Sequence, residues 1–333
     1  MNAQRSNKEI KKNNRLRTGI AIVLAIPVLS PLLFLSGNDY LTQIVTRILI
    51  YGILVLSVEM CWGQTGIFTF GQAALFGIGG YTVGLITTKT TITNLFIALS
   101  FAIVVGALIS ILIGFFLFSG KRVGELYVAL VTLALSYICE RLANSWTFLG
   151  SGNGIPGIPF PTILGKEINS NIGLFFMVYS FFAFTLIICV ILVNSQFGLT
   201  MNAVRDDEER AEFFGYRRNK VQILVFTFSA VLASLAGGLF ALSEGLVSPS
   251  MSGLALSTTT VLWVVLGGRG TFFGPLIALA LLQAVNIQLQ NILPSLWTIL
   301  LGIILLLTML FLPKGLSSIP SLYRQRKSER SAK

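Results

Sequence analysis

Apolar segments of about 18 to 24 residues recur along almost the whole sequence, and they limit what this chain can fold into. A helix needs about 20 apolar residues to cross the hydrocarbon core of a bilayer. Hydrophobic residues make up 54% of the chain and charged residues only 11%. A membrane β-barrel would instead show short strands of alternating polarity, and that pattern is missing. The sequence therefore predicts an all-α integral membrane protein.

Ten candidate transmembrane helices can be drawn along the chain. We place them at residues 19–36, 41–60, 64–87, 95–118, 126–143, 172–193, 221–243, 251–267, 271–290 and 295–312. Eight crossings with two re-entrant segments fit the same pattern. The chain is thereby divided into a basic N-terminus (1–18), a transmembrane domain (19–312) and a basic tail (313–333).

The distribution of basic residues orients these helices. Six Lys or Arg lie in residues 1–17 and six more in 314–333, each set with a single acidic residue. Such clusters mark the cytoplasmic side of a membrane protein and can also contact anionic lipid. Both termini are therefore predicted to be cytoplasmic. Because the basic residues are confined to the ends and a few short loops, the net charge of +11 does not indicate a nucleic-acid partner.

Two of the apolar segments are interrupted by glycine. The first reads WGQTGIFTFGQAALFGIGGYTVGLI and the second VLWVVLGGRGTFFGPLIALALLQAVN. Glycine lets a helix break and lets backbones approach closely. A pair of such segments in the two halves of a membrane protein indicates an internal repeat and a transport pathway. The same glycines could serve as packing faces between helices, and the two interpretations are compatible.

The predicted pathway combines exposed backbone with small polar side chains. Few ionisable groups lie within the apolar segments, so the pathway is expected to select small molecules by shape and polarity. The candidate pathway residues are Gln64, Thr65, Gly66, Thr69, Gly71, Gln72, Gly267, Gly268, Arg269, Gly270, Thr271 and Gly274.

Four ionisable residues lie inside or near the ends of apolar segments. They are Arg47, Glu59, Glu140 and Arg141. Charged side chains are costly in lipid and usually functional or paired. We expect structural pairing for most of them, with substrate contact as the alternative for any one. Glu59 lies close enough to the predicted inner boundary to reach the cytoplasmic interface.

The residues needed for enzymatic chemistry are scarce. The chain has no His, and its three cysteines, Cys61, Cys139 and Cys189, show no CxxC spacing. The spacing of the cysteines supports neither a zinc site nor a disulfide framework. We expect the three cysteines to be packing residues. We predict no catalytic residues, no metal and no cofactor bound by this chain.

The longest loop predicted outside the membrane spans residues 144–171. It is rich in Gly and Pro, as in FLGSGNGIPGIPFPTILGKEINSN. Such a rigid, turn-rich cap could receive a partner that delivers substrate. A simple connector with Gly and Pro turns is the alternative.

The one substantial cytoplasmic loop, residues 194–220, concentrates charge in RDDEERAEFFGYRR. Acidic residues open this stretch, Gly215 offers a stop, and basic residues follow, which suits the dipole of a short helix. Val204, Ala211 and Phe214 give it an apolar strip, to which Phe213 could add. The pattern predicts an amphipathic cytoplasmic helix that docks onto another surface.

The segment Glu209-Arg-Ala-Glu-Phe-Phe-Gly215 resembles the Glu-Ala-Ala-x-x-x-Gly loop of ABC importer permeases. The blocks GQTGIFTFGQAALFGIGGY, LYVALVTLALSYICERLANSW, GSGNGIPGIP and WVVLGGRGTFFGP resemble, in order, those of LivM-type permeases for branched-chain amino acids. The likeness covers about residues 45–315. Arg210 departs from the signature, and no Leu-Pro follows Ile223.

This resemblance implies a set of partners. In the family, two membrane subunits sit on two cytoplasmic ATP-binding subunits that carry ATP and Mg, and an extracytoplasmic binding protein delivers substrate. The sequence has no GxxxxGK[ST] phosphate loop of its own. By the resemblance, Glu209, Ala211 and Gly215 form the contact core of the coupling helix, with Arg205 and Asp207 flanking it. The implied location is the prokaryotic plasma (inner) membrane.

Only the resemblance indicates which class of substrate the chain transports. The Val-Thr-Leu-Ala and Gly-Ile-Pro-Gly-Ile-Pro blocks resemble amino-acid permeases, whereas Trp263 with Gly-Gly-Arg-Gly-Thr resembles the related urea permeases. Branched-chain or other small neutral amino acids are the expected substrates, and urea or a short-chain amide is the alternative. An ion-coupled secondary transporter would need mid-membrane ion coordination and would have no use for a coupling helix.

Overall fold

The computed structural model describes residues 39–90, 92–120, 124–163 and 165–292. The helices that it places are α2 (Asp39–Val58), the π-helix η1 (Glu59–Gly63), α3 (Gln72–Lys89), α4 (Leu95–Phe118), α5 (Glu125–Ser145), α6 (Asn171–Asn194), α7 (Gln196–Asp206), α8 (Glu208–Phe213), α9 (Arg218–Glu244), α10 (Leu254–Gly267) and α11 (Phe273–Ile292). Short 3₁₀ turns are η2 (Thr147–Leu149), η3 (Ser151–Asn153) and η4 (Pro249–Ser252).

The helix positions follow most of the predicted crossings. Among the described residues, five helices are long and apolar enough to span a bilayer: Asp39–Gly63, α4, α5, α6 and α9. Two shorter apolar stretches, Leu254–Gly267 and Phe273–Asn286, accompany them. The segments predicted at 19–36 and 295–312 lie outside the described residues, so the total number of crossings stays a prediction.

The glycine interruption predicted within the segment 64–87 is present. Residues 66–70 are irregular, and α3 begins only at Gln72. The physical reason is local. Gly66 adopts the left-handed conformation with φ +78°, which suits glycine and ends the preceding helix.

Polar side chains set several helix starts. Asn94 accepts hydrogen bonds from the first turn of α4, Ser170 caps α6, and Ser195 caps α7. Asp207 caps α8 by accepting a hydrogen bond from the Arg210 backbone N–H. Each cap satisfies a donor that the helix itself leaves open, so short polar residues between apolar runs fix where the helices begin.

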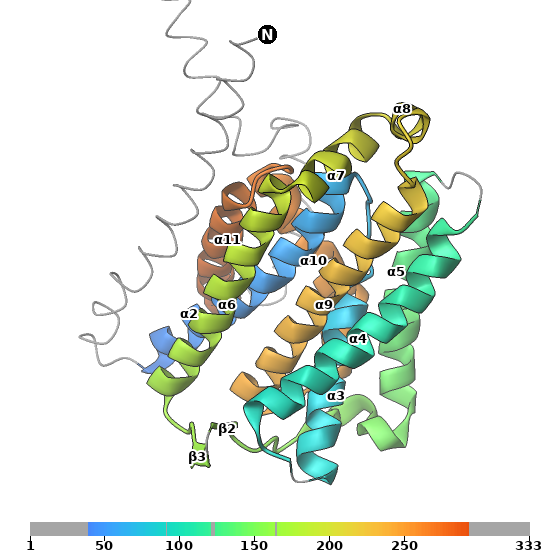
Figure 1. Ribbon diagram of the computed structural model, residues 1–333. Coiled ribbons are helices and arrows are strands. Elements are labelled where there is room, and N and C mark those ends of the chain that lie inside the picture. Colours follow the sequence, from blue (N-terminus) through green and yellow to red (C-terminus); the bar gives the residue numbers. More distant parts are fainter. Residues whose placement is uncertain (1–38, 91, 121–123, 164, 293–333) are drawn as a thin grey trace, which may run out of the picture.

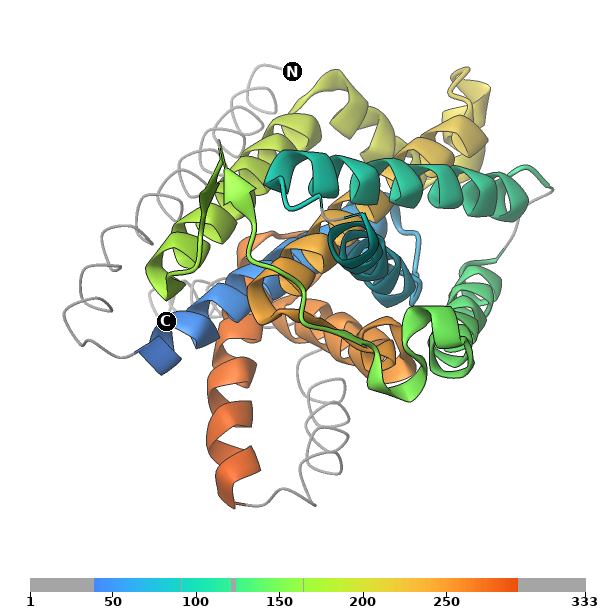
Figure 2. The same cartoon turned by 90° about the horizontal axis from the view of Figure 1, so that it is seen from below.

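The described helices form a bundle organised around α9. Figure 1 shows α9 running between the end that carries α7 and α8, here called the α8 end, and the opposite end with its short strands. It packs on α2, α3 and α4. Seen from the opposite end in Figure 2, α3 lies nearly end-on in the middle of the bundle, and α11 extends away from the other described helices.

Glycine and serine make the contact between α3 and α9 possible. A Cβ at Gly79 would overlap the Ser234 carbonyl, and one at Gly237 would overlap the Phe76 carbonyl. The Ser234 hydroxyl donates to the Leu75 carbonyl at 3.1 Å. Small residues let helices in lipid come close enough for extensive van der Waals contact. The predicted packing role of glycine is thus confirmed at these positions.

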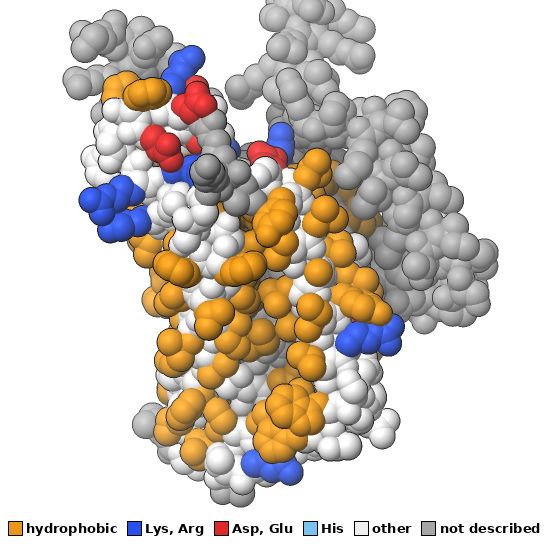
Figure 3. Space-filling view, turned by 90° about the vertical axis from the view of Figure 1, so that its right-hand side faces the viewer, with side chains coloured by type: hydrophobic (Ala, Val, Ile, Leu, Met, Phe, Trp, Pro, Cys, Tyr) orange, Lys and Arg blue, Asp and Glu red, His pale blue; other side chains and the backbone are white. Residues whose placement is uncertain are grey.

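The outward faces of α4 and α5 are apolar. Figure 3 shows hydrophobic side chains spread over this side of the bundle, while the acidic side chains visible in that view gather at the α8 end. Leu112, Phe116 and Leu126 are each more than two thirds exposed. A surface of this kind is expected where the surrounding solvent is lipid.

The loop between α5 and α6 is fastened to the opposite end. Strand β1 (Ile155–Pro156) pairs antiparallel with β4 (Leu246–Val247), and β2 (Thr162–Ile163) pairs with β3 (Lys166–Glu167). Ile158 is buried. The Gly-Pro-rich loop is therefore packed against the bundle, and its use as a docking site stays a prediction.

The α3–α9 contact gives a stability prediction. Gly79→Ala should destabilise the folded protein by about 1–3 kcal/mol, because the added methyl group would force α3 away from the Ser234 carbonyl. Gly84→Ala is the matched control, since its Cβ would make only ordinary contacts at 3.4 Å or more. Thermal unfolding of the two purified variants should separate them, and equal melting temperatures would contradict the close approach.

Candidate translocation and coupling site

The first glycine break, residues 63–71, connects α2 to α3 without regular helix over most of its length. It follows a π-helical turn, Glu59–Gly63, of a kind often found at functional sites. Its backbone is held by hydroxyl groups from other helices. Thr132 accepts from the Phe70 N–H at 3.0 Å, and Ser136 and Ser257 donate to the Phe70 carbonyl at 2.8 and 2.7 Å.

The second glycine break, residues 267–274, is the tight turn between α10 and α11. Gly268 and Gly270 have φ of +91° and +85°, a conformation that favours glycine. A Cβ at Gly267 or Gly274 would overlap the backbone of the other. These two glycines therefore serve the close approach of the helix ends, whereas Gly268 and Gly270 allow the turn itself.

The two breaks meet at the α8 end. Oε1 of Glu59 accepts a hydrogen bond from the Gly270 backbone N–H at 2.6 Å and another from Gln64 Nε2 at 3.3 Å. The Arg269 guanidinium lies over the Trp62 ring, 5.7 Å from its centroid. The expectation that Glu59 reaches the cytoplasmic interface was wrong, because its side chain is fully buried in this junction.

Arg205, near the end of α7, reaches the same junction. Its Nη1 donates to the Gly63 carbonyl at 2.8 Å, and its side chain lies beside Gly66. A cavity of about 420 Å³ opens between this arginine, the first break and the start of α5. The segment that carries α7 and α8 is thus bonded directly to the backbone of the first break.

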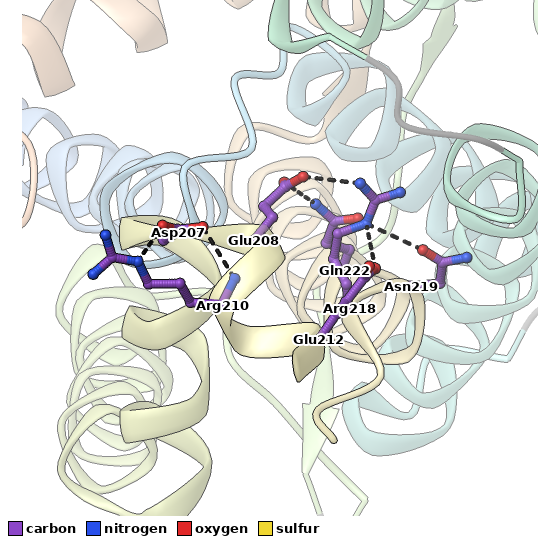
Figure 4. A network of polar contacts seen from close by, with 7 residues as sticks. All are labelled: Asp207, Glu208, Arg210, Glu212, Arg218, Asn219 and Gln222. Carbon is purple, nitrogen blue, oxygen red and sulfur yellow. Dashed lines mark hydrogen bonds and ion pairs between the residues drawn. The ribbon is translucent and has the colours of Figure 1, made fainter. Parts of the chain in front are cut away.

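Helix α8 is fastened to the base of α9 by charge. Arg218, whose side chain is only 6% exposed, donates to Glu208 at 2.8 Å, and Gln222 donates to the same carboxylate at 3.1 Å (Figure 4). Asp207 pairs with Arg210 at 2.9 Å. Buried charged groups need such partners, so this network fixes α8 against the bundle.

Two aromatic side chains at the end of α8 are open to solvent, among exposed charged residues. Phe213 is 90% exposed and Phe214 is 82% exposed. Gly215 follows with φ +84° and has open space around its Cα. Ala211, by contrast, is buried against its own chain. Among the predicted contact residues, Ala211 therefore packs inward, whereas Glu209 and Gly215 are exposed beside the two phenylalanines.

A second cavity, of about 430 Å³, lies between α2, α10 and α11, toward the opposite end. We call it the Arg47 cavity, because Arg47 lines it and pairs with Glu244 of α9. Nε donates to Oε1 at 2.9 Å and Nη2 to Oε2 at 2.6 Å. The sequence pointed to pairing of Arg47 but not to Glu244, which is 197 residues away.

The three helices around this cavity show the same sequence of layers. Near the opposite end, Arg47 of α2, Thr259 of α10 and Asn286 of α11 line the cavity. Next comes an apolar cluster of buried residues: Val55, Val58, Trp263, Val264 and Leu279. The junction of the two glycine breaks follows at the α8 end. The apolar cluster therefore separates the cavity from the junction.

Most predicted pathway side chains lie within the wall of the first break. Gln64, Thr65, Thr69 and Gln72 are all buried. Thr65 donates to the Cys61 carbonyl, and Thr69 accepts from the Gly71 N–H at 3.0 Å. Thr65 and Gly66 also line the cavity of about 420 Å³ beside Arg205. In this structure these polar groups hold irregular backbone in place.

In the second break, Thr271 donates to the Gly268 carbonyl at 3.0 Å, and Arg269 is exposed over Trp62. Sequence reasoning missed the residues of the Arg47 cavity. The sequence feature that pointed to this cavity was an arginine two turns inside an apolar helix. That feature alone does not predict which other residues lie around the arginine.

Comparison with known proteins decides the family. A family model described as "Branched-chain amino acid transport system / permease component" matches residues 40–309. The chain belongs to this family. The match includes both glycine breaks, the α7–α8 loop and all described helices beyond the first residue of α2.

Individual relatives agree with this assignment. The chain is 29% identical to the LivM permease protein of a high-affinity branched-chain amino acid transport system from Escherichia coli, over 89% of this chain and 74% of the relative. It is 25% identical to a probable LivM from Methanocaldococcus jannaschii, over 84% and 93%. An autoinducer 2 import permease, LsrC from Photorhabdus laumondii, is 23% identical over 90% and 96%. No solved structure matches.

Membership of this family makes the chain an ABC importer permease, a multi-pass membrane transport subunit that is not itself an enzyme. The Arg47 cavity, the apolar cluster and the junction are then candidate parts of its translocation pathway, and α8 is the candidate coupling element. Among the described residues, no group of three or more metal-ligating side chains occurs.

The junction gives a second prediction. Glu59→Leu should lower the free energy of unfolding by about 1–3 kcal/mol, because it leaves the buried donors of Gly270 and Gln64 without their acceptor. Glu59→Gln keeps an acceptor oxygen and should lose less. Thermal unfolding in detergent would test the order, and a leucine variant as stable as the glutamine variant would contradict the bonding described.

Proposed function

We propose that this chain is the membrane-spanning subunit of an importer that carries branched-chain or other small neutral amino acids inward by alternating access, driven by ATPases bound to α8. The observation that supports this most strongly is the bond from Arg205 to the Gly63 carbonyl. It joins the cytoplasmic loop to the point where α2, α10 and α11 converge.

Transmission through this bond follows from the rigidity of its neighbours. The Glu208–Arg218–Gln222 network ties α8 to α9, and α7 carries Arg205 into the first break. A displacement of α8 would therefore shift α7 and the Gly63 backbone together. Because Glu59 connects the first break to Gly270, the α10–α11 turn would receive the same displacement. Both walls of the pathway would then respond to a single input.

The docking surface of α8 suits a protein partner. The rings of Phe213 and Phe214 are exposed to solvent. Phenylalanine side chains are more often buried in the protein interior. Aromatic residues in a pocket of a partner are frequent anchors of protein interfaces. Glu209, in the first turn of α8, and the turn at Gly215 complete the surface that we assign to the ATP-binding subunit.

The remaining parts of the machine are supplied by other chains. Two cytoplasmic subunits would bind ATP and Mg, a second, homologous permease subunit would complete the pathway, and an extracytoplasmic protein would deliver substrate to the opposite end. The positive-inside rule supports this orientation, because Arg205, Arg217 and Arg269 lie at the α8 end. The assembly would lie in the prokaryotic inner membrane.

The coupling role predicts a clear separation of folding from transport. Replacing Phe213 and Phe214 together by Asp should reduce ATP-driven uptake at least tenfold, because two solvated carboxylates would oppose burial in the ATPase groove. The protein should still reach the membrane at normal levels, since both rings are exposed in the isolated chain. Uptake in cells and membrane abundance by immunoblot are the measurements.

The matched control replaces the same two residues by Leu, which keeps an apolar surface. This variant should retain most of the uptake. If the Asp variant transports normally, α8 is a solvated connector and the coupling proposal fails. If the Leu variant is as inactive as the Asp variant, ring shape rather than apolar docking controls the contact, which contradicts the stated reason.

The substrate class can be tested directly. Cells that carry the complete transporter, and no other carrier for these compounds, should take up labelled leucine and not labelled urea. The urea alternative rests only on the likeness around Trp263. Uptake of urea without leucine would overturn the amino-acid assignment while leaving the importer assignment intact. Gly215→Trp, which strains a left-handed turn, should abolish uptake of whichever substrate is carried.

A further inference from the structure

The ion pair in the Arg47 cavity has a position unlike that of a simple structural pair. Arg47 lies about two turns inside α2, and its side chain is 48% exposed although it belongs to an apolar span. Charged side chains at such depth usually face the bundle interior or a water-filled path. Here the guanidinium faces a cavity of about 430 Å³.

The pair also borders a second cavity. Glu244, the partner of Arg47, lines an opening of about 240 Å³ together with Ser248 and Ser250. Tyr51 and Leu256 line both openings. The ion pair therefore stands between two neighbouring spaces, with the positive group turned to one and the negative group bordering the other.

Each partner keeps bonding capacity beyond the pair. The contact uses Nε and Nη2 of Arg47, and no residue in the described part of the chain bonds Nη1. A guanidinium has five N–H donors, and each carboxylate oxygen can accept more than one hydrogen bond. An incoming ligand could therefore bind both groups without first breaking the pair.

One part of the cavity wall is apolar, and Gln43, Thr259, Gln283 and Asn286 make another part polar. Ile44, Ile48 and Leu256 line the apolar part beside Trp263, and the apolar cluster closes the cavity toward the α8 end. A volume of this size lies in the range of small-molecule sites, which combine apolar walls with a few placed polar groups.

From this arrangement we propose that Arg47 and Glu244 form a transit site for a zwitterion, in which Arg47 binds the carboxylate of an α-amino acid, Glu244 binds its ammonium group, and the side chain contacts the apolar wall. The inference rests on the proposed function and deepens it, because it names the chemical feature that the pathway recognises. A neutral molecule such as urea would have no counterpart for the two charges.

The test uses the complete transporter in proteoliposomes. ATP is supplied on the side of the membrane that carries α8. The binding protein and saturating labelled leucine are supplied on the opposite side. Uptake and ATP hydrolysis are measured in the same vesicles. Arg47→Gln and Glu244→Gln should each lower leucine uptake per ATP hydrolysed at least tenfold. Arg141→Gln is the matched control, because Arg141 is another span arginine that stacks on Tyr137 and lines neither cavity.

A doubly neutral variant, Arg47→Met with Glu244→Leu, separates recognition from structure. Replacing an ion pair by apolar residues often leaves a protein stable. If the pair only joins α2 to α9, this variant should regain uptake close to that of the unaltered protein, and the proposal is overturned. If the pair binds the zwitterion, uptake should stay at least tenfold lower although the variant has a normal melting temperature.

Failure of the broader proposal would look different. If the unaltered transporter hydrolyses ATP with its loaded binding protein but moves no leucine, the amino-acid assignment itself is wrong and the zwitterion site falls with it. If the unaltered transporter moves leucine and both single variants do so at the same rate per ATP, only the site assignment is overturned.

Discussion

The architecture depends on satisfying irregular backbone at membrane depth. Lipid offers no hydrogen bonds, so every broken helix needs protein partners for its exposed N–H and C=O groups. The structure provides them from distant parts of the chain: hydroxyls of α5 and α10 hold the Phe70 backbone, and the Glu59 carboxylate holds the Gly270 N–H. The helices around the breaks are thereby joined to one another through the breaks themselves. A displacement of one of these helices would therefore displace the others through the breaks.

This dependence explains why the candidate coupling element and the candidate pathway lie so close together. Arg205 contacts the first break through a backbone carbonyl, so the contact survives changes in neighbouring side chains. The layers seen on α2, α10 and α11 place a polar cavity, an apolar cluster and the junction in series. Alternating access requires that such a cluster yield when the junction moves. The bonds between loop and break supply the connection through which ATPase motion would act.

Sequence reasoning located the apolar helices, the two glycine breaks and the charged loop, because each leaves a local signature. The segment drawn from residue 64 contains the first break itself, and α3 begins only at Gln72, after the left-handed turn at Gly66. Sequence reasoning also gave Glu59 an interfacial role, because a bond to Gly270, 211 residues away, leaves no local trace. It gave Ala211 a docking role, although that side chain packs inward. The Arg47–Glu244 pair was not predicted, because its residues are 197 positions apart. An arginine in an apolar segment indicates that a partner exists but not which residue it is.

The central position of α9 has a consequence for synthesis. Its closest partners, α2, α3 and α4, all precede it in the chain, and the Ser234–Leu75 bond joins residues 159 positions apart. Until α9 is made, the face of α3 that carries Gly79 lacks its partner, although α3 and α4 can already pack together. The bundle can therefore acquire its final spacing only when α9 arrives.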